Sequence, residues 1–358
     1  MSVNYSFPAV RGIQAGRPCY IAMCPMSVIP KIFVFDEAEV PPEIRAQRKL
    51  NKGRIPEMAN YLINNKTNYT LSSLTASIDG ETEFIPYSEN NPEDNIGNFK
   101  ISMDAQILIN DGQHRRAAIE EAVKNESDLG RDHISVLFFI DEDLKKSQQM
   151  FADLNKHAVR PSPSLATLYD QREELSNIAR RVMNDVTVFS KLTETEKTSI
   201  SNKSMKLFTL SGIKNANKAL LNKGKNDAIS EDEVQNAIEF WKYIVSNLKD
   251  WNLAAERQVN SWELRERYIH AHGVLLHAFG ILGSQIINNK SDWSALDKLS
   301  TIDWSRDSNL WKGRAVVNGR ITKSITNVKL TANQIKKQIG LKLTSEELHR
   351  EKEFKANA

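Results

Sequence analysis

The sequence predicts an α+β protein, in which a small mixed sheet with helices is followed by a mainly helical C-terminal part. Short apolar runs bounded by Gly and Pro predict strands near the N-terminus, at 20–24 and 31–35. A continuous apolar run at 134–140 is typical of a buried strand. From residue 164 to about 289, apolar residues recur instead at three- and four-residue spacing, which indicates helices.

Local signals extend this outline to most of the chain. A strand at 69–78 ends in Asp79-Gly80, and 82–86 is expected to return as its hairpin partner. Ser230-Glu-Asp-Glu233 has the residues of a capping box and therefore begins a helix. The predicted helices are 41–49, 54–63, 141–155, 165–186, 204–221, 230–251 and 261–287.

A domain boundary is predicted at Arg160-Pro161-Ser162-Pro163, because two prolines this close cannot continue a helix. The first domain is then 1–160 and the helical second domain 161–358, as expected for a chain too long for one typical core. Basic residues outnumber acidic ones from Arg160 onward, and the reverse holds before it. Phosphate neutralisation dominates nucleic-acid affinity, so the second domain is the better candidate for a DNA surface, although solvated helix faces also carry such an excess.

The composition, with 40% apolar and 26% charged residues, is that of an ordinary globular protein. Only two cysteines are present, Cys19 and Cys24, and they are expected to be free thiols in a reducing compartment. No apolar run approaches the length of a membrane span, and the first residues lack the pattern of a signal peptide. These features lead us to expect a cytoplasmic protein without membrane association.

The residues with the most distinctive chemistry lie in a predicted strand, turn and helix between Gln106 and Ala122. The Ile-rich run 107–109 indicates the strand, Asp111-Gly112 the turn and 117–124 the helix. Such a turn directs the free N–H groups of the first helical residues outward, and the helix macrodipole adds a partial positive charge there. The pattern therefore favours an anion at this turn.

Charged side chains at the same turn support that prediction. Arg115 and Arg116 carry guanidinium groups suited to phosphate or carboxylate, and His114 can donate a hydrogen bond or exchange a proton. Gly112 lets the backbone bend, and Asp111 can cap the helix or hold an arginine. The alternative is an ordinary Asp-Gly turn before a solvated helix start. The residues predicted to contact phosphate are Gly112, Gln113, His114, Arg115 and Arg116.

Asp111-Gly112-Gln113-His114-Arg115 resembles the signature of the DGQHR-domain proteins, whose best-known members form the DndB family. The turn is also similar to those of ParB-type domains and sulfiredoxins, where a Gly-containing loop and an Arg at a helix start hold nucleotide phosphates. Gln113 stands where sulfiredoxins carry a reactive Cys, which excludes thiol chemistry here. The resemblance covers about residues 10–165 and implies a ParB/sulfiredoxin-like fold for the first domain.

The resemblance implies four further site residues. Basic residues on the early helices of ParB-like and DGQHR domains approach the signature turn, which suggests Arg48 and Arg54. An Asn at the end of the corresponding helix recurs in DGQHR proteins, so Asn155 and the adjacent Lys156 are expected at the opposite wall. Arginines before a helix and an Asn at a helix C-terminus are, however, also common without any function.

The resemblance to DndB proteins implies a cytoplasmic regulator that binds double-stranded DNA and controls transcription of a DNA phosphorothioation, or sulfur-modification, gene cluster. Other DNA-modification proteins are implied as partners, and we expect a homo-oligomer. A scaffold that docks such proteins on its helical domain is a further hypothesis. No cofactor is assigned to the binder, and a nucleoside triphosphate with Mg²⁺ is the candidate cofactor.

An enzyme is the alternative to a binder. His114 as general acid or base and Asp111 as a Mg²⁺ ligand would hydrolyse a nucleoside triphosphate or nick DNA. The motif holds one carboxylate, and Asp104 is separated from it by a strand, so the enzyme ranks second. No metal site is assigned to His270, His272 and His277, because their apolar neighbours indicate a packed core.

Two further segments near the C-terminus are relevant to DNA. The basic Gly turns at 312–314 and 318–323 have a composition that suits backbone phosphates. The segment 331–350 predicts two helices joined at Gly340, with Thr344 or Ser345 capping the second. Acidic residues begin that second helix and would repel phosphates, so we predict a terminal helical hairpin rather than a DNA-reading motif.

Overall fold

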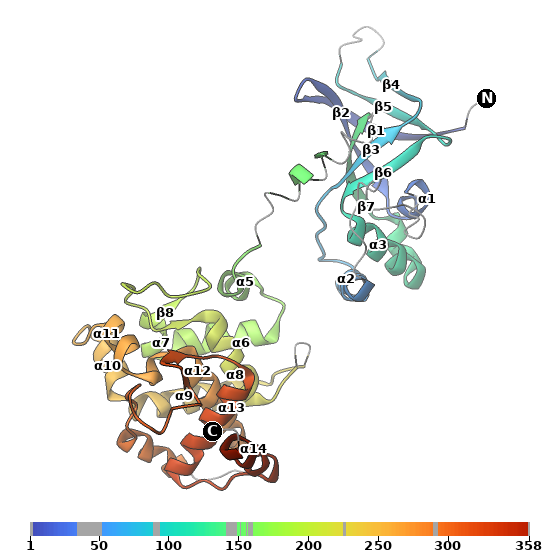
Figure 1. Cartoon of the computed structure of the whole chain (residues 1–358). Helices are drawn as coiled ribbons and strands as arrows, with labels where there is room; N and C mark the ends of the chain where they lie inside the picture. Colours follow the sequence, from blue (N-terminus) through green and yellow to red (C-terminus); the bar gives the residue numbers. More distant parts are fainter. Residues whose placement is uncertain are drawn as a thin grey trace. The chain divides into compact units, whose positions relative to one another are not determined.

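The computed structural model describes residues 3–33, 52–88, 94–140, 149–150, 152–154, 156, 160–224, 227–288 and 293–356. Two compact units divide the chain, Met1–Val159 and Arg160–Ala358 (Figure 1). The first combines a mixed sheet with helices and the second is mostly helical. The predicted α+β class is therefore confirmed.

A seven-stranded sheet forms the centre of the N-terminal unit in the part that the structure describes (Figure 1). Its strand order is β4-β5-β1-β2-β7-β3-β6. The pair β3–β7 is parallel and the other neighbours are antiparallel, so the sheet is mixed. The strands are β1 (Asn4–Gln14), β2 (Arg17–Pro25), β3 (Leu74–Asp79), β4 (Thr82–Pro86), β5 (Ile96–Ser102), β6 (Gln106–Asp111) and β7 (His133–Ile140).

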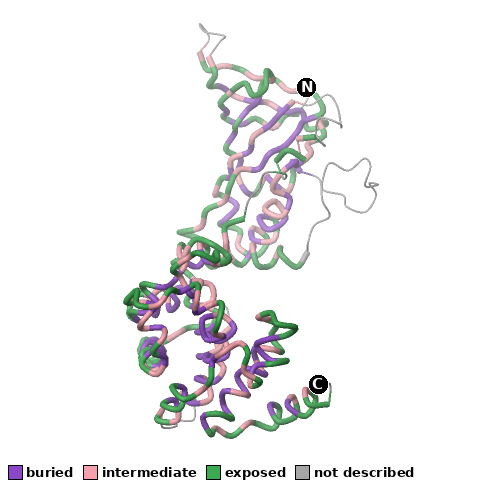
Figure 2. The backbone as a smooth tube through the Cα atoms, turned by 60° about the vertical axis from the view of Figure 1, so that its left-hand side comes forward, coloured by how far each residue is buried: buried purple, intermediate pink, exposed green. Residues whose placement is uncertain are grey.

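The helices of this unit are α1 (Ile29–Ile32), α2 (Ile55–Asn64) and α3 (Gln113–Asn125), with short 3₁₀ turns at Lys52–Arg54 and Ser127–Arg131. Apolar residues of these helices and of β3 and β7 form one buried cluster. Figure 2 shows the buried residues running along the strands and along one side of the helices. Helix α3 contacts both α1 and α2, which fixes the position of its first turn.

Two predicted elements of the N-terminal unit were wrong. The segment predicted as a strand at 31–35 begins inside α1, where Pro30 occupies the first helical turn, and 34–35 lie outside the described residues. The predicted hairpin of 69–78 with 82–86 is absent among the described strand pairs, since β3 pairs with β6 and β7 while β4 pairs with β5. Residues 74–78 are buried on both faces, which suits a central strand.

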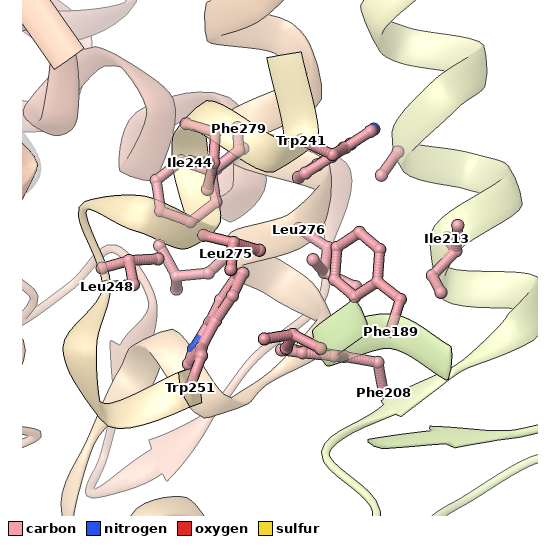
Figure 3. Close-up of a cluster of buried hydrophobic side chains, with 14 of the residues drawn as sticks. Phe189, Phe208, Ile213, Trp241, Ile244, Leu248, Trp251, Leu275, Leu276 and Phe279 are labelled. Atoms are coloured by element: carbon pink, nitrogen blue, oxygen red, sulfur yellow. The ribbon is translucent and has the colours of Figure 1, made fainter. Parts of the chain in front are cut away.

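The C-terminal unit packs its helices around a core rich in aromatic rings. Figure 3 shows Phe189, Phe208, Trp241, Trp251 and Phe279 gathered from different helices and from strand β9. Its helices are α5 (Pro163–Tyr169), α6 (Glu174–Asp185), α7 (Thr187–Leu192), α8 (Leu210–Leu221), α9 (Glu231–Ser246), α10 (Lys249–Ala255), α11 (Ser261–Arg267), α12 (Gly273–Asn288), α13 (Ile325–Ile339) and α14 (Ser345–Ala356). Short elements are β8 (Thr193–Glu194), β9 (Phe208–Thr209), β10 (Val316–Val317), β11 (Arg320–Ile321) and the 3₁₀ turns Ile269–Ala271 and Trp293–Thr301.

Apolar spacing located most helices of this unit but missed α7, extended the helix predicted at 204–221 over β9, and did not predict the breaks between helices. The predicted helices 165–186, 230–251 and 261–287 are each divided, for example between α9 and α10. The capping box is confirmed, because Ser230 Oγ accepts from the Glu233 N–H and the Glu233 carboxylate accepts from the Ser230 N–H. Helices α8 and α12 approach closely at Gly280, where a Cβ would lie 2.2 Å from the Ala216 carbonyl oxygen.

Candidate functional site

The strand, turn and helix predicted around Asp111 are present. Strand β6 ends at Asp111, Gly112 adopts the left-handed conformation with φ +104°, and α3 begins at Gln113. The Arg116 N–H donates to the Gly112 carbonyl at 2.9 Å, which makes the first turn of the helix. Because α3 begins four residues before the predicted start at 117, Arg115 and Arg116 lie in its first turn, where the macrodipole is positive.

Arg115 is held against the turn by two partners. Its Nη2 lies 2.6 Å from Asp111 Oδ2, and its Nη1 donates to Ser72 Oγ on the segment before β3. Asp111 therefore holds an arginine, which is one of the two roles predicted for it. The Arg115 side chain is 15% exposed while the Asp111 carboxylate is 47% exposed, so the pair reaches solvent through the acid.

Arg116, the second arginine of the first turn, also has two partners. Its Nη1 lies 2.5 Å from Glu120 Oε2, and its Nη2 donates to the Pro30 carbonyl at 3.2 Å, which ties α3 to α1. Its side chain is 12% exposed. The Nε of Arg116 is buried and has no hydrogen-bond partner within the described parts of the chain. Buried donors are normally satisfied, so this N–H is an exception among the buried polar groups of the unit.

The side chains of Gln113 and His114 are placed differently from each other. Gln113 is 6% exposed and turns inward, where its Nε2 donates to the Ile109 carbonyl at 3.5 Å. Only its backbone N–H remains at the helix start for an anion. His114 is half-buried at the same turn. The turn therefore combines the N–H groups of the helix start with two guanidinium groups. The side-chain amide of Gln113 is buried and is not part of this set.

The structure describes two of the four residues expected from early and late helices. Arg54 is exposed at the start of α2, which packs against α3. Lys156 is exposed in a short helical segment. Arg48 and Asn155 lie outside the described residues, as do the predicted helix 41–49 and most of 141–155.

A family model described as DndB, DNA-sulfur modification-associated, matches residues 7–342. The chain belongs to the DndB family. The match extends through both units, well beyond the residues that carry the signature resemblance, and it associates the protein with DNA sulfur modification. No curated protein and no solved structure matches the chain. Among the described helices, none combines the length and apolarity needed to cross a bilayer.

The ion pairs of this DndB-family turn set what its residues can do chemically. Both acids that hold the arginines are about half exposed, whereas the arginine side chains are 15% and 12% exposed. A phosphate that reached either guanidinium group would compete with the carboxylate already bound to it. In the described ranges, no three His, Cys, Asp or Glu side chains converge in a way that would hold a metal. The partner that the structure shows for Asp111 is Arg115.

The basic turn at 312–314 does not present its arginine to solvent. Arg314 is 6% exposed and forms a two-bonded ion pair with Glu351 of α14. The sequence prediction of a phosphate contact is wrong for this residue, because the chain supplies an internal carboxylate. The contacts of Arg115 with Ser72 and of Arg116 with Pro30 were also missed, since these partners are distant in sequence and carry no local signal.

Proposed function

We propose that this DndB-family protein binds double-stranded DNA and regulates transcription of a DNA sulfur-modification gene cluster, with the turn Asp111–Arg116 contacting a backbone phosphate. The observation that carries the proposal is the pair of arginines in the first turn of α3, beside a left-handed Gly112. Family membership supplies the link to DNA sulfur modification. Other proteins of the modification system and a second copy of the chain are proposed as partners.

The contact would work by exchange of partners. A DNA phosphate arriving at the start of α3 meets backbone N–H groups, the macrodipole and the guanidinium of Arg115 or Arg116. It takes the place of a half-exposed carboxylate, Asp111 or Glu120, which returns to water. Arginine–phosphate hydrogen bonds are charge-assisted and can be bidentate, so the exchange is favourable in the field of the whole duplex.

Arg116→Ala is expected to weaken binding to a duplex carrying the promoter of the gene cluster about tenfold and to reduce the salt slope by about 1. The reason is the loss of one phosphate contact. Fluorescence anisotropy at several salt concentrations measures both quantities. Arg131→Ala, which removes an exposed arginine from the 3₁₀ turn after α3, is the control and should bind nearly as wild type. Equal affinity and slope for Arg116→Ala and wild type would contradict the proposal.

A second variant separates charge from geometry. Arg115→Lys keeps the positive charge but cannot join Asp111 and Ser72 through one planar group. We expect it to retain the salt slope and lose part of the affinity. Nucleoside triphosphate hydrolysis that disappears in His114→Ala while DNA binding persists would instead favour the enzyme.

A further inference from the structure

A cavity of about 510 Å³ lies in the C-terminal unit, where the loop between β8 and β9 meets the start of α12. This volume is in the range of small-molecule sites. Leu207, Phe208 and Ala271 give it an apolar floor, and all three are buried. Its wall carries Trp262, Arg265, His272, Gly273, Arg306 and Lys323.

Three cations line this cavity. In the described part of the chain, Arg265, Arg306 and Lys323 form no ion pair, in contrast to Arg115 and Arg116. Glu266 is the acidic residue of the lining, and it is exposed. The cavity therefore has an excess of positive charge close to an apolar floor, where an anion interacts more strongly than in open water.

The two arginines are fixed by backbone carbonyls. Arg265 donates from Nη2 to the carbonyls of Asn202 and Ser204, both at 2.9 Å, and so holds the loop that forms the rim. Arg306 donates to the carbonyls of Glu266 at 3.1 Å and Gly319 at 2.9 Å. These contacts position the guanidinium groups without neutralising them. The site is thus held in place before any ligand arrives.

The protonation of His272 responds to the same charges. The pKa of His272 is lowered to about 4, mainly by burial and also by the positive charges of Arg306, Lys323 and Arg265, while a backbone hydrogen bond to the Arg265 carbonyl acts in the opposite direction. His272 is neutral at pH 7, and its Nε2 donates to the Arg265 carbonyl at 2.8 Å. Arg265, Arg306 and Lys323 line the same cavity as this imidazole.

Two further features match the parts of a nucleotide. A Cβ on Gly273, the first residue of the 16-residue helix α12, would lie 4.0 Å from Lys323 Nζ, so the ammonium and the helix start converge. Trp262 is 45% exposed on the wall of the cavity, although large aromatic side chains are usually well buried. An exposed indole offers a surface on which a base can stack.

We propose that this cavity binds a nucleotide, with its phosphates on Arg306, Lys323 and the start of α12 and its base on Trp262. A free nucleoside polyphosphate and a nucleotide of single-stranded DNA share this chemistry. The inference goes beyond the proposed function, which places duplex binding at the start of α3 in the other unit.

The test is titration of the full chain with ATP, with a fluorescein-labelled oligothymidylate and with inorganic phosphate, by calorimetry and anisotropy. Lys323→Glu is expected to weaken the nucleotide ligand about tenfold or more. Trp262→Ala should weaken that ligand by a similar factor, because a base stack typically contributes about 1–3 kcal/mol, and should leave phosphate binding unchanged. The control is Lys352→Glu, a charge reversal at an exposed residue of α14.

The outcomes distinguish the source of the nucleotide. Binding of ATP without the oligothymidylate identifies a free nucleotide, and tighter binding of the oligothymidylate identifies a DNA strand. In either case the pKa of His272, followed by NMR, should rise when the ligand offsets the three cations. Arg116→Ala should bind the nucleotide as wild type does, even if it loses affinity for duplex DNA. The nucleotide site and the duplex site can therefore be tested separately. Failure of both nucleotides to bind, or equal affinity in wild type and Lys323→Glu, would overturn the inference.

Discussion

Glu351→Ala is expected to lower the free energy of unfolding of the C-terminal unit by about 3–5 kcal/mol, because it leaves a buried charge without its partner. Glu351 is 5% exposed, and its two oxygens lie 2.7 and 2.8 Å from the guanidinium of Arg314. Lys337 and Asn333 donate to the same carboxylate. Denaturant unfolding followed by tryptophan fluorescence measures this unit alone, since all six tryptophans lie beyond residue 160.

Glu346→Ala provides the matched control on the same helix. Glu346 is 76% exposed and pairs with Arg350 at 2.5 Å, so its removal should cost about 0–1 kcal/mol. The comparison separates burial from charge, because both variants remove one glutamate of α14 that pairs with an arginine. Losses of similar size in the two variants would show that the buried ion pair contributes no more than a surface one.

Stability of the same unit should also depend on pH through Glu351. Burial alone would raise the pKa of Glu351, but hydrogen bonds from Arg314 and Lys337 outweigh burial and lower this pKa to about 2. The folded pKa is then below the unfolded value of about 4.3, so the stabilisation is complete above that pH and is lost as pH falls toward 2. Wild type should lose more stability than Glu351→Gln between pH 5 and pH 2.5, which urea unfolding at the two pH values measures.

This ion-pair cluster explains why a sequence interpretation of α14 was only partly right. The helical hairpin of α13 and α14 is present, and Thr344 caps the second helix with a reciprocal bond to Glu347. The acidic start of the second helix indicated a segment that repels phosphate. Instead, Glu347 is buried, and its carboxylate lies 2.5 Å from the ammonium of Lys336, which is also buried. Charge composition gives no sign of which partner a buried acid will find.

Local signals predicted the signature turn well for a physical reason. An Ile-rich strand, an Asp-Gly turn and an alanine-rich helix are encoded within neighbouring residues, so their order is visible in the sequence. The partners of the arginines lie elsewhere, at Ser72 and Pro30, and are set by packing of β3 and α1 against α3. Sequence therefore identified the charged groups and could not show that each is already paired.

The cavity of the C-terminal unit was not foreseen for the same reason. Its cations come from α11, from the segment after Trp304 and from the residue before the α13 cap, and none forms a local pattern. In the sequence, Lys323 belongs to the basic Gly turn at 318–323. The fold brings it to the first residue of α12, about fifty positions earlier in the chain. Sites assembled from such distant single residues require the three-dimensional arrangement.

Gly112→Ala is expected to destabilise the N-terminal unit by about 2–4 kcal/mol, since it combines two costs. A side chain at φ +104° strains the backbone, and the new Cβ would lie 2.4 Å from Leu74 Cδ2, a fully buried atom group of β3. The same Cβ would also approach Arg115 Nε and Nη2 to 3.0 Å and disturb the pair with Asp111. Duplex affinity should therefore fall together with stability.

Gly16→Ala separates the two costs, because Gly16 also has a positive φ of +73° but nothing lies within 4 Å of the position its Cβ would take. Only the backbone cost of about 1–2 kcal/mol applies there, and the duplex affinity should be unchanged. Hydrogen exchange of peptides from β6 and α3 measures the effect, since tryptophan fluorescence does not report on this unit. Faster exchange in Gly112→Ala than in Gly16→Ala is the expected result. Equal hydrogen-exchange protection in the two variants would contradict this prediction. It would mean that the Leu74 side chain moves aside for the new Cβ, and that the close contact between the turn and β3 does not hold Arg115 in place.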